Sequence, residues 1–159
     1  MYGRLRFIPD PVRPRQDEAD ADVADDHPDD MARLARALHH LRAFTVTPED
    51  CYFCLWDGYS DVHVPRSAAN GPMVSIPHRE YFLLRGSLAD LADWAEVLGG
   101  GNHTPAFAWP ADRAWCTASD VDPHWAGIGA GRQAMDTLLN APELDIVAAE
   151  PSEPQPTYH

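Results

Sequence analysis

The sequence predicts an α+β fold, with a mainly antiparallel sheet and about three helices in a single domain. Segments with the 3.6-residue apolar spacing of helices are separated by short apolar runs typical of strands. The connections near residues 110 and 122 are too short for the crossover that parallel strands need, which favours antiparallel neighbours. A length of 159 residues, 45% of them hydrophobic, suits one domain with its own core.

We expect three regions: residues 1–30 as an extended arm and acidic loop, 31–149 as the α+β domain, and 150–159 as a Pro-rich tail. Residues 1–14 alternate weakly and predict one short strand or a docked arm. Residues 16–30 hold eight acidic and no basic residues. Because residues 16–26 offer little beyond alanine and Val23 to bury, this stretch predicts a mobile loop.

The first helix is expected from Pro28 to about Arg42. Pro28 suits a first helical turn, and the acidic residues after it favour the positive end of a helix. An apolar face then follows at helical spacing, formed by Met31, Leu34, Ala35, Leu38 and Leu41.

The sequence pattern between residues 51 and 84 predicts three strands. Residues 51–56 are apolar on every side and aromatic, which favours a buried strand, although Thr47 and Pro48 form a helix-start signal just before them. Residues 61–73 indicate an irregular loop. Two further strands are expected around residues 74–76 and 81–84, separated by Pro77.

Local signals define the remaining elements. Ser87 and Asp90 resemble a capping box that opens a helix ending at three glycines, 99–101. We expect a hairpin of residues 107–109 and 114–119. A strand at 125–128, a helix at 132–139 and a strand at 144–148 should follow.

Composition restricts the functional classes. The net charge is −13, and the 12 basic residues, all arginine, form no cluster, so binding to nucleic acid or to an anionic membrane is not expected. The chain shows no apolar run long enough to cross a bilayer and no signal-peptide pattern, and its three cysteines fit a reducing compartment. A cytoplasmic protein is therefore predicted. The acidic segment favours a solvated linker, with a basic partner as the alternative.

The segment Asp120-Val-Asp122-Pro-His124 is the main candidate site. Its three polar residues are spaced two apart, so an extended chain would point them to one side, where they could bind a divalent metal or act as acid and base, with Cys116 nearby. A turn between two strands uses the same residue types and is the favoured interpretation. No cofactor is predicted.

Other reactive residues favour structural roles. Cys51 and Cys54 would face opposite sides of a strand, which favours buried, inert thiols over a zinc or redox pair. The cysteine and tryptophans of residues 115–125 are interpreted as core, and Gly127–Gly131 as a strand-to-helix turn. Three aromatic residues beside chain breaks could instead line a pocket or an interface: Tyr59, Trp109 and Trp125.

Three blocks of the sequence resemble an uncharacterised family of actinobacterial proteins. The blocks are residues 47–59 (Thr-Pro-Glu-Asp-Cys-Tyr-Phe-Cys-Leu-Trp-Asp-Gly-Tyr), 81–86 (Tyr-Phe-Leu-Leu-Arg-Gly) and 107–131. The resemblance covers most of residues 30–156. It implies relatives but no activity, because the family has no established one.

The leading hypothesis is a protein-binding or interaction module. It depends on the lack of a complete catalytic motif, on the acidic segment and on the aromatic content. The alternative is a small metal-dependent or acid/base enzyme that uses Asp120, Asp122 and His124. The sequence does not indicate an oligomeric state.

Overall fold

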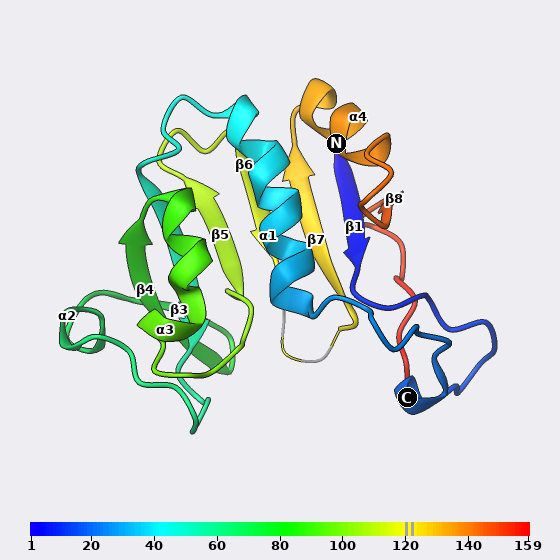
Figure 1. Ribbon diagram of the computed structural model, residues 1–159, viewed down its shortest axis with the longest axis horizontal. Helices are drawn as coiled ribbons and strands as arrows, with labels where there is room; N and C mark the ends of the chain where they lie inside the picture. Colours follow the sequence, from blue (N-terminus) through cyan, green and yellow to red (C-terminus); the bar gives the residue numbers. More distant parts are fainter. Residues whose placement is uncertain (120, 122) are drawn as a thin grey trace.

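The computed structural model describes residues 1–119, 121 and 123–159. They form a single α+β domain around one eight-stranded sheet, in the order β3-β4-β2-β5-β6-β7-β1-β8 (Figure 1). All neighbouring strands of this sheet pair in antiparallel fashion. The predicted fold class is therefore confirmed.

The strands follow the predicted segments closely. They are β1 (Tyr2–Arg6), β2 (Cys51–Trp56), β3 (Met73–Ile76), β4 (Arg79–Gly86), β5 (Phe107–Pro110), β6 (Trp115–Ala118), β7 (Trp125–Ala130) and β8 (Ile146–Ala148). The helical elements are η1 (Glu18–Asp20), α1 (Asp30–Leu41), η2 (Arg42–Phe44), α2 (Arg66–Ala69), η3 (Leu88–Asp93), α3 (Trp94–Val97) and α4 (Arg132–Leu139).

The N-terminal strand is an interior strand. β1 pairs with β7 on one side and with β8 on the other, so it joins the last strand to the rest of the sheet. Of the two alternatives left open for residues 1–14, the structure confirms the short strand. A larger residue than Gly3 would be crowded there, because an added Cβ would lie 3.2 Å from the Val147 carbonyl and would displace the Met135 methyl group.

Helix α1 crosses the middle of the sheet (Figure 1). It begins later than predicted, at Asp30, because the Asp29 side chain accepts a hydrogen bond from the backbone of Ala32 and so caps the helix. Its buried side chains are Met31, Leu34, Ala37, Leu38 and Leu41. The predicted face is confirmed except that Ala37, rather than Ala35, is buried.

The second predicted helix has two parts. Ser87 and Asp90 form the expected capping box, but residues 88–93 are a 3-10 helix that continues as α3. The helix ends as predicted, since Gly99 and Gly100 adopt positive φ angles. A one-turn helix, α2, lies within residues 61–73, so the prediction of an irregular loop was wrong at that point.

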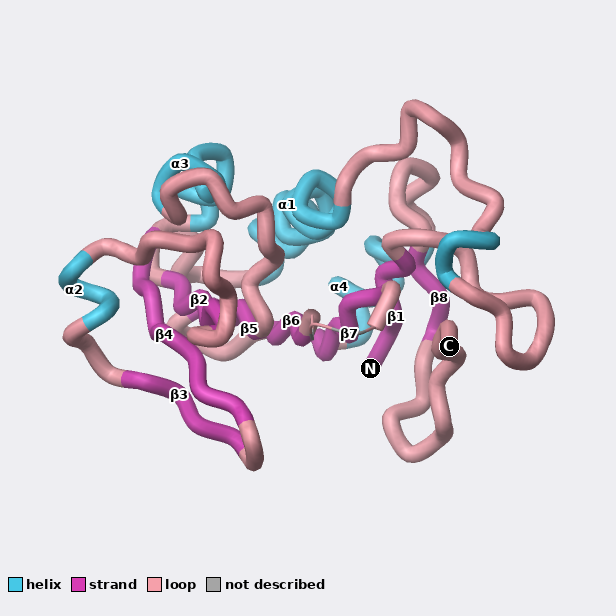
Figure 2. The backbone as a smooth tube through the Cα atoms, turned by 90° about the horizontal axis from the view of Figure 1, so that it is seen from below, coloured by secondary structure: helices cyan, strands magenta, loops and turns pink. Residues whose placement is uncertain are grey.

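The two faces of the sheet differ. The buried side chains of α1, η3, α3 and α4 all belong to one core cluster, together with inward strand residues such as Leu5, Phe53 and Ile128. Figure 2 shows α1 and α3 on this side of the sheet. On the other side, which we call the open face, the β3–β4 hairpin and the loop after β8 project outward.

Of the helices described in the structure, none is both long and apolar enough to cross a membrane.

Candidate functional site: a groove on the open face of the sheet

A groove runs over strands β6 and β7 on the open face. Its floor consists of the outward residues of these strands: Cys116, Ala118, Gly127 and Gly129. The register places Cys116 opposite Gly129 and Ala118 opposite Gly127, so two adjacent rows of the sheet carry almost no side-chain volume. The hollow has a volume of about 390 Å³. We call it the open-face groove.

Packing within the chain does not require glycine at the centre of this floor. A Cβ added to Gly127 would meet its nearest neighbours only at 3.7 Å, an ordinary contact. Glycine inside a strand weakens it and often marks a place where a ligand or another backbone approaches closely. The prediction that residues 127–131 form a strand-to-helix turn was therefore wrong for Gly127 and Gly129, which lie inside β7; only Gly131 precedes α4.

One side of the groove is aromatic. Strands β2, β4 and β5 carry a second apolar cluster on the open face, in which Cys54 and Tyr81 are buried beneath partly exposed neighbours. The Tyr52 and Trp109 rings stack there at 5.5 Å between centroids. A smaller hollow of about 380 Å³ adjoins Trp109 and shares Cys116 with the groove. Trp109 thus agrees with the alternative considered from the sequence, a place in the wall of a pocket.

The other side is formed by Tyr2, Trp125 and the segment after β8. The Tyr2 ring lies over Gly129, where an added Cβ would be 3.2 Å from it. Trp115 is buried in the core as predicted, but Trp125 is only half-buried and lines the groove, so for Trp125 the alternative of a pocket residue holds and the core interpretation was wrong. The third aromatic of that alternative, Tyr59, packs instead against the core on the helical side and stacks on His103.

An ionic cluster of Arg4, Arg6, Asp10 and His124, largely buried, supports this wall. The Arg4 guanidinium lies 5.6 Å from the Trp125 ring centroid and donates two hydrogen bonds, of 2.8 and 3.0 Å, to Asp10. Burial raises the pKa of Asp10, but hydrogen bonds from Arg4 and His124 and the charges of Arg4 and Arg6 outweigh it and lower the pKa to about 2. The Arg4 Nε has no acceptor among the described residues.

The C-terminal tail, residues 150–159, is fixed at three points. The Trp125 indole N–H donates to the Pro156 carbonyl at 3.1 Å, and the Tyr158 hydroxyl donates to the Pro9 carbonyl at 2.6 Å. The His159 amide donates to the Gln16 carbonyl at 3.1 Å. The tail thus runs along the surface, as expected, and it also forms part of the groove wall.

His124 is the one member of the predicted acid/base segment whose surroundings are described. Its ring is buried, 3.1 Å from Asp10 and edge-on to Tyr158 at 4.7 Å between centroids. His124 therefore helps to hold the tail and β1 together. Asp120 and Asp122, the other two members of that prediction, lie outside the described residues.

Cys116 does not come near His124. It lies opposite Gly129, five residues farther along β7, which corresponds to roughly 17 Å in a strand. Among residues 1–119, 121 and 123–159, no three His, Cys, Asp or Glu side chains gather where they could hold a metal ion.

The three thiols occupy two environments. Cys51 and Cys54 are fully buried on opposite faces of β2, as predicted, and burial raises their pKa values to about 11 and about 12. Cys116 is exposed, so interpreting it as core was wrong. Sequence alternation could have shown this, because buried Trp115 and Thr117 flank it on the opposite side of the strand.

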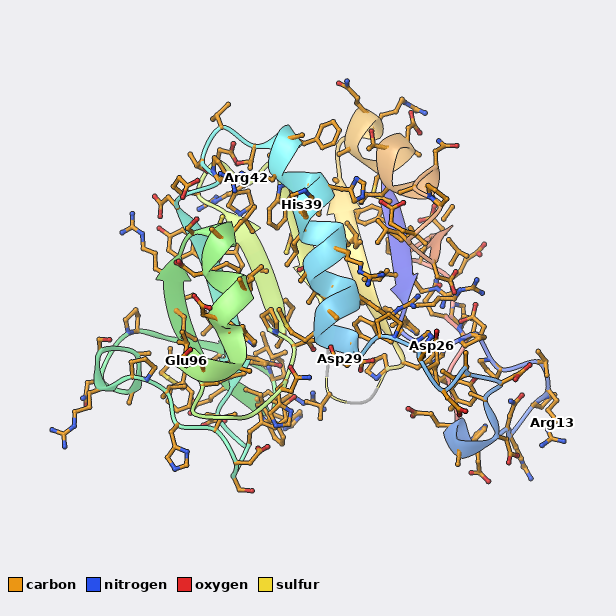
Figure 3. The ribbon with its side chains drawn as sticks, viewed as in Figure 1. Arg13, Asp26, Asp29, His39, Arg42 and Glu96 are labelled. Atoms are coloured by element: carbon orange, nitrogen blue, oxygen red, sulfur yellow. The ribbon has the colours of Figure 1, made fainter. Side chains whose placement is uncertain are left out.

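The acidic segment, residues 16–30, lies beyond β8 near the tail, where Figure 3 labels Asp26. It contains the predicted loop, interrupted only by the short η1 helix. Two anchors hold it: Gln16 is buried, and the His27 ring contacts the Phe7 carbonyl. Most of its carboxylates remain exposed.

Comparison of the chain with models of known protein families, with curated proteins and with solved structures found no match. The resemblance to actinobacterial proteins therefore stays a prediction.

Proposed function

We propose that the protein is a protein-binding module whose contact surface is the open face, centred on the open-face groove. The observation that supports this most directly is the uncovered, apolar hollow over β6 and β7. At Gly127 its floor has a glycine where the chain's own packing would accept a larger residue. Contiguous apolar surface of this kind marks interaction sites in soluble proteins.

Charge suggests what the partner carries. The tail ends at the start of the acidic segment, where the charge of Glu18 acts on Tyr158, so a partner on the course of the tail would have carboxylates near one end. The rest of the segment rises towards α1 on the helical side, away from the groove (Figure 2). A basic residue beside an apolar partner segment would be attracted there. This agrees with the basic partner considered from the sequence. No nucleic-acid or membrane surface is proposed, because the basic residues form no cluster.

The direct test uses Ala118→Arg. Ala118 is exposed on the groove floor, so arginine would fill the groove without entering the core. Ala92→Arg is the matched control, because Ala92 is exposed on η3 on the helical side. A displayed peptide library selected on the wild-type protein should yield apolar peptides that bind the Ala92→Arg variant equally and the Ala118→Arg variant weakly.

Cys116 provides an independent readout. A bound peptide should slow alkylation of this thiol, because the thiol lies on the groove floor. Selected peptides that bind Ala118→Arg as tightly as wild type, and that leave Cys116 alkylation unchanged, would refute the groove as the binding surface. Circular dichroism of both arginine variants checks that each is folded.

A further inference from the structure

The tail presents an example of a ligand bound at the groove. It is rich in proline, with Pro151, Pro154 and Pro156, and the Trp125 indole N–H holds the Pro156 carbonyl. Pro151 and Gln155 line the groove itself. A proline-rich segment of this chain therefore already lies against the aromatic wall.

The tail sequence favours one backbone conformation. Proline fixes its own φ near −65°, and a residue that precedes proline is restricted to extended or polyproline II geometry. Glu153 and Gln155 both precede prolines. Residues 150–153 instead form a turn, closed by a hydrogen bond from the Glu153 amide to the Glu150 carbonyl. The polyproline II expectation therefore applies to residues 154–159; such a segment makes no internal backbone hydrogen bonds, so its Pro156 carbonyl is available to the Trp125 indole.

The rest of the groove suits the same kind of segment. Proline-rich ligands dock in shallow grooves lined by aromatic rings, because the preformed helix loses little entropy on binding. Here the Tyr2 and Trp125 rings flank the small residues Gly127 and Gly129. The hollow of about 390 Å³ lies beside the tail and is not filled by it.

The course of the tail adds charge complementarity. Its last residue reaches Gln16, the first residue of the acidic segment. A ligand that replaced the tail along the same course would end beside the exposed carboxylates of Asp17 and Glu18, whereas Asp20 is already paired with Arg13. Arginine or lysine at that end of the ligand would therefore strengthen binding, whereas the tail itself carries Glu150 and Glu153.

We propose that the open-face groove recognises proline-rich segments of partner proteins that carry a basic residue at one end, and that the tail is the built-in competitor for this site. The inference rests on the proposed function, since it names the partner of the same surface. Such a segment and the tail would share one donor, the Trp125 indole N–H, so binding of the segment displaces the Pro156 carbonyl from Trp125.

The experiment uses the full chain and synthetic peptides. The probe is a labelled ten-residue peptide with proline at every second position and two arginines at one end; its control has the prolines replaced by alanine. Fluorescence polarisation measures binding, and the indole N–H signal of Trp125 in a nitrogen–proton NMR spectrum reports the loss of the Pro156 contact. We expect the proline probe to bind and to shift this signal, and the alanine peptide to do neither.

Two variants test the mechanism. In the Tyr158→Phe background, where the tail is already loosened, Trp125→Phe removes the indole donor and should weaken probe binding about three- to tenfold, the effect of one hydrogen bond. Tyr158→Phe removes the contact with the Pro9 carbonyl, loosens the tail and should tighten probe binding about threefold. Tyr59→Phe is the matched control and should leave the affinity for the probe unchanged, because Tyr59 packs against the core on the helical side.

The outcomes separate the two proposals. Absence of probe binding to both wild type and Tyr158→Phe overturns the proline-rich partner, as does equal binding of the alanine peptide. If library peptides without proline still bind the wild-type protein and fail to bind the Ala118→Arg variant while the proline probe does not bind, the protein-binding function stands. In that case only the inference about proline-rich partners fails. Unchanged affinity in Tyr158→Phe overturns the role of the tail as competitor.

Discussion

Replacing Asp10 by asparagine should destabilise the protein by an amount that depends on pH. Asp10 is the shared acceptor for Arg4 and Arg6, and the Arg4 side chain is only 7% exposed. The pKa of Asp10 falls from 3.8 to about 2 on folding. At about 1.4 kcal/mol per pKa unit, the charged carboxylate stabilises the fold by about 2 kcal/mol at neutral pH.

The sign follows from the depressed pKa. The stabilisation is complete above the unfolded pKa, near pH 4, and is lost as the pH falls through the folded pKa of about 2. The difference in free energy of unfolding between wild type and Asp10→Asn should therefore be about 2 kcal/mol at pH 6 and shrink towards zero at pH 2.

Urea unfolding at a series of pH values measures this difference. Asp20→Asn is the control, because Asp20 pairs with Arg13 on the exposed surface, where an ion pair contributes little. A difference that stays constant from pH 6 to pH 2, or an Asp10→Asn loss no larger than that of the control, would refute the buried-cluster argument.

Three further predictions concern single residues. In the folded protein, iodoacetamide should modify Cys116 alone, and mass spectrometry should find Cys51 and Cys54 modified only after urea is added; desolvation raises the pKa of all three thiols, but only Cys116 is exposed to the reagent. Ser87→Ala should lower the free energy of unfolding by about 1 kcal/mol, since it removes the capping box of η3; an unchanged urea midpoint would argue against that cap. His78→Gly should raise the thermal midpoint, because His78 has a φ of 70° in the β3–β4 turn and strain there costs about 1 kcal/mol; a lower midpoint would contradict this reasoning.

Local sequence signals predicted the elements well because each acts within a few residues. α4 has the predicted bounds, and the capping box of Ser87 and Asp90 forms as expected. The 3-10 geometry of residues 88–93 was not predicted, since the same apolar residues serve either helix type. α2 was missed because a single turn leaves no periodic pattern.

The groove could not be found from the sequence. Its floor depends on which strands lie side by side, and nothing local shows that β1 returns from the other end of the chain to cover one edge of β7. Gly127 and Gly129 next to Arg132 suggest a turn as readily as a strand interior. Their spacing of two residues was nevertheless a signal, because period two puts both glycines on one face of a strand.

The pairing of β1 also determines when the groove comes into being. Strands β2 to β6 lie within residues 51–118 and form their ladders with one another, so that part of the sheet can assemble during synthesis. β1 is made first but has no partner until β7 and β8 have been made. Contacts of such large sequence separation form late, because closing a long loop costs entropy before pairing compensates for it. Tyr2 and Arg4 take their places in the wall at that step, so a newly made chain acquires its binding surface only when assembly is complete.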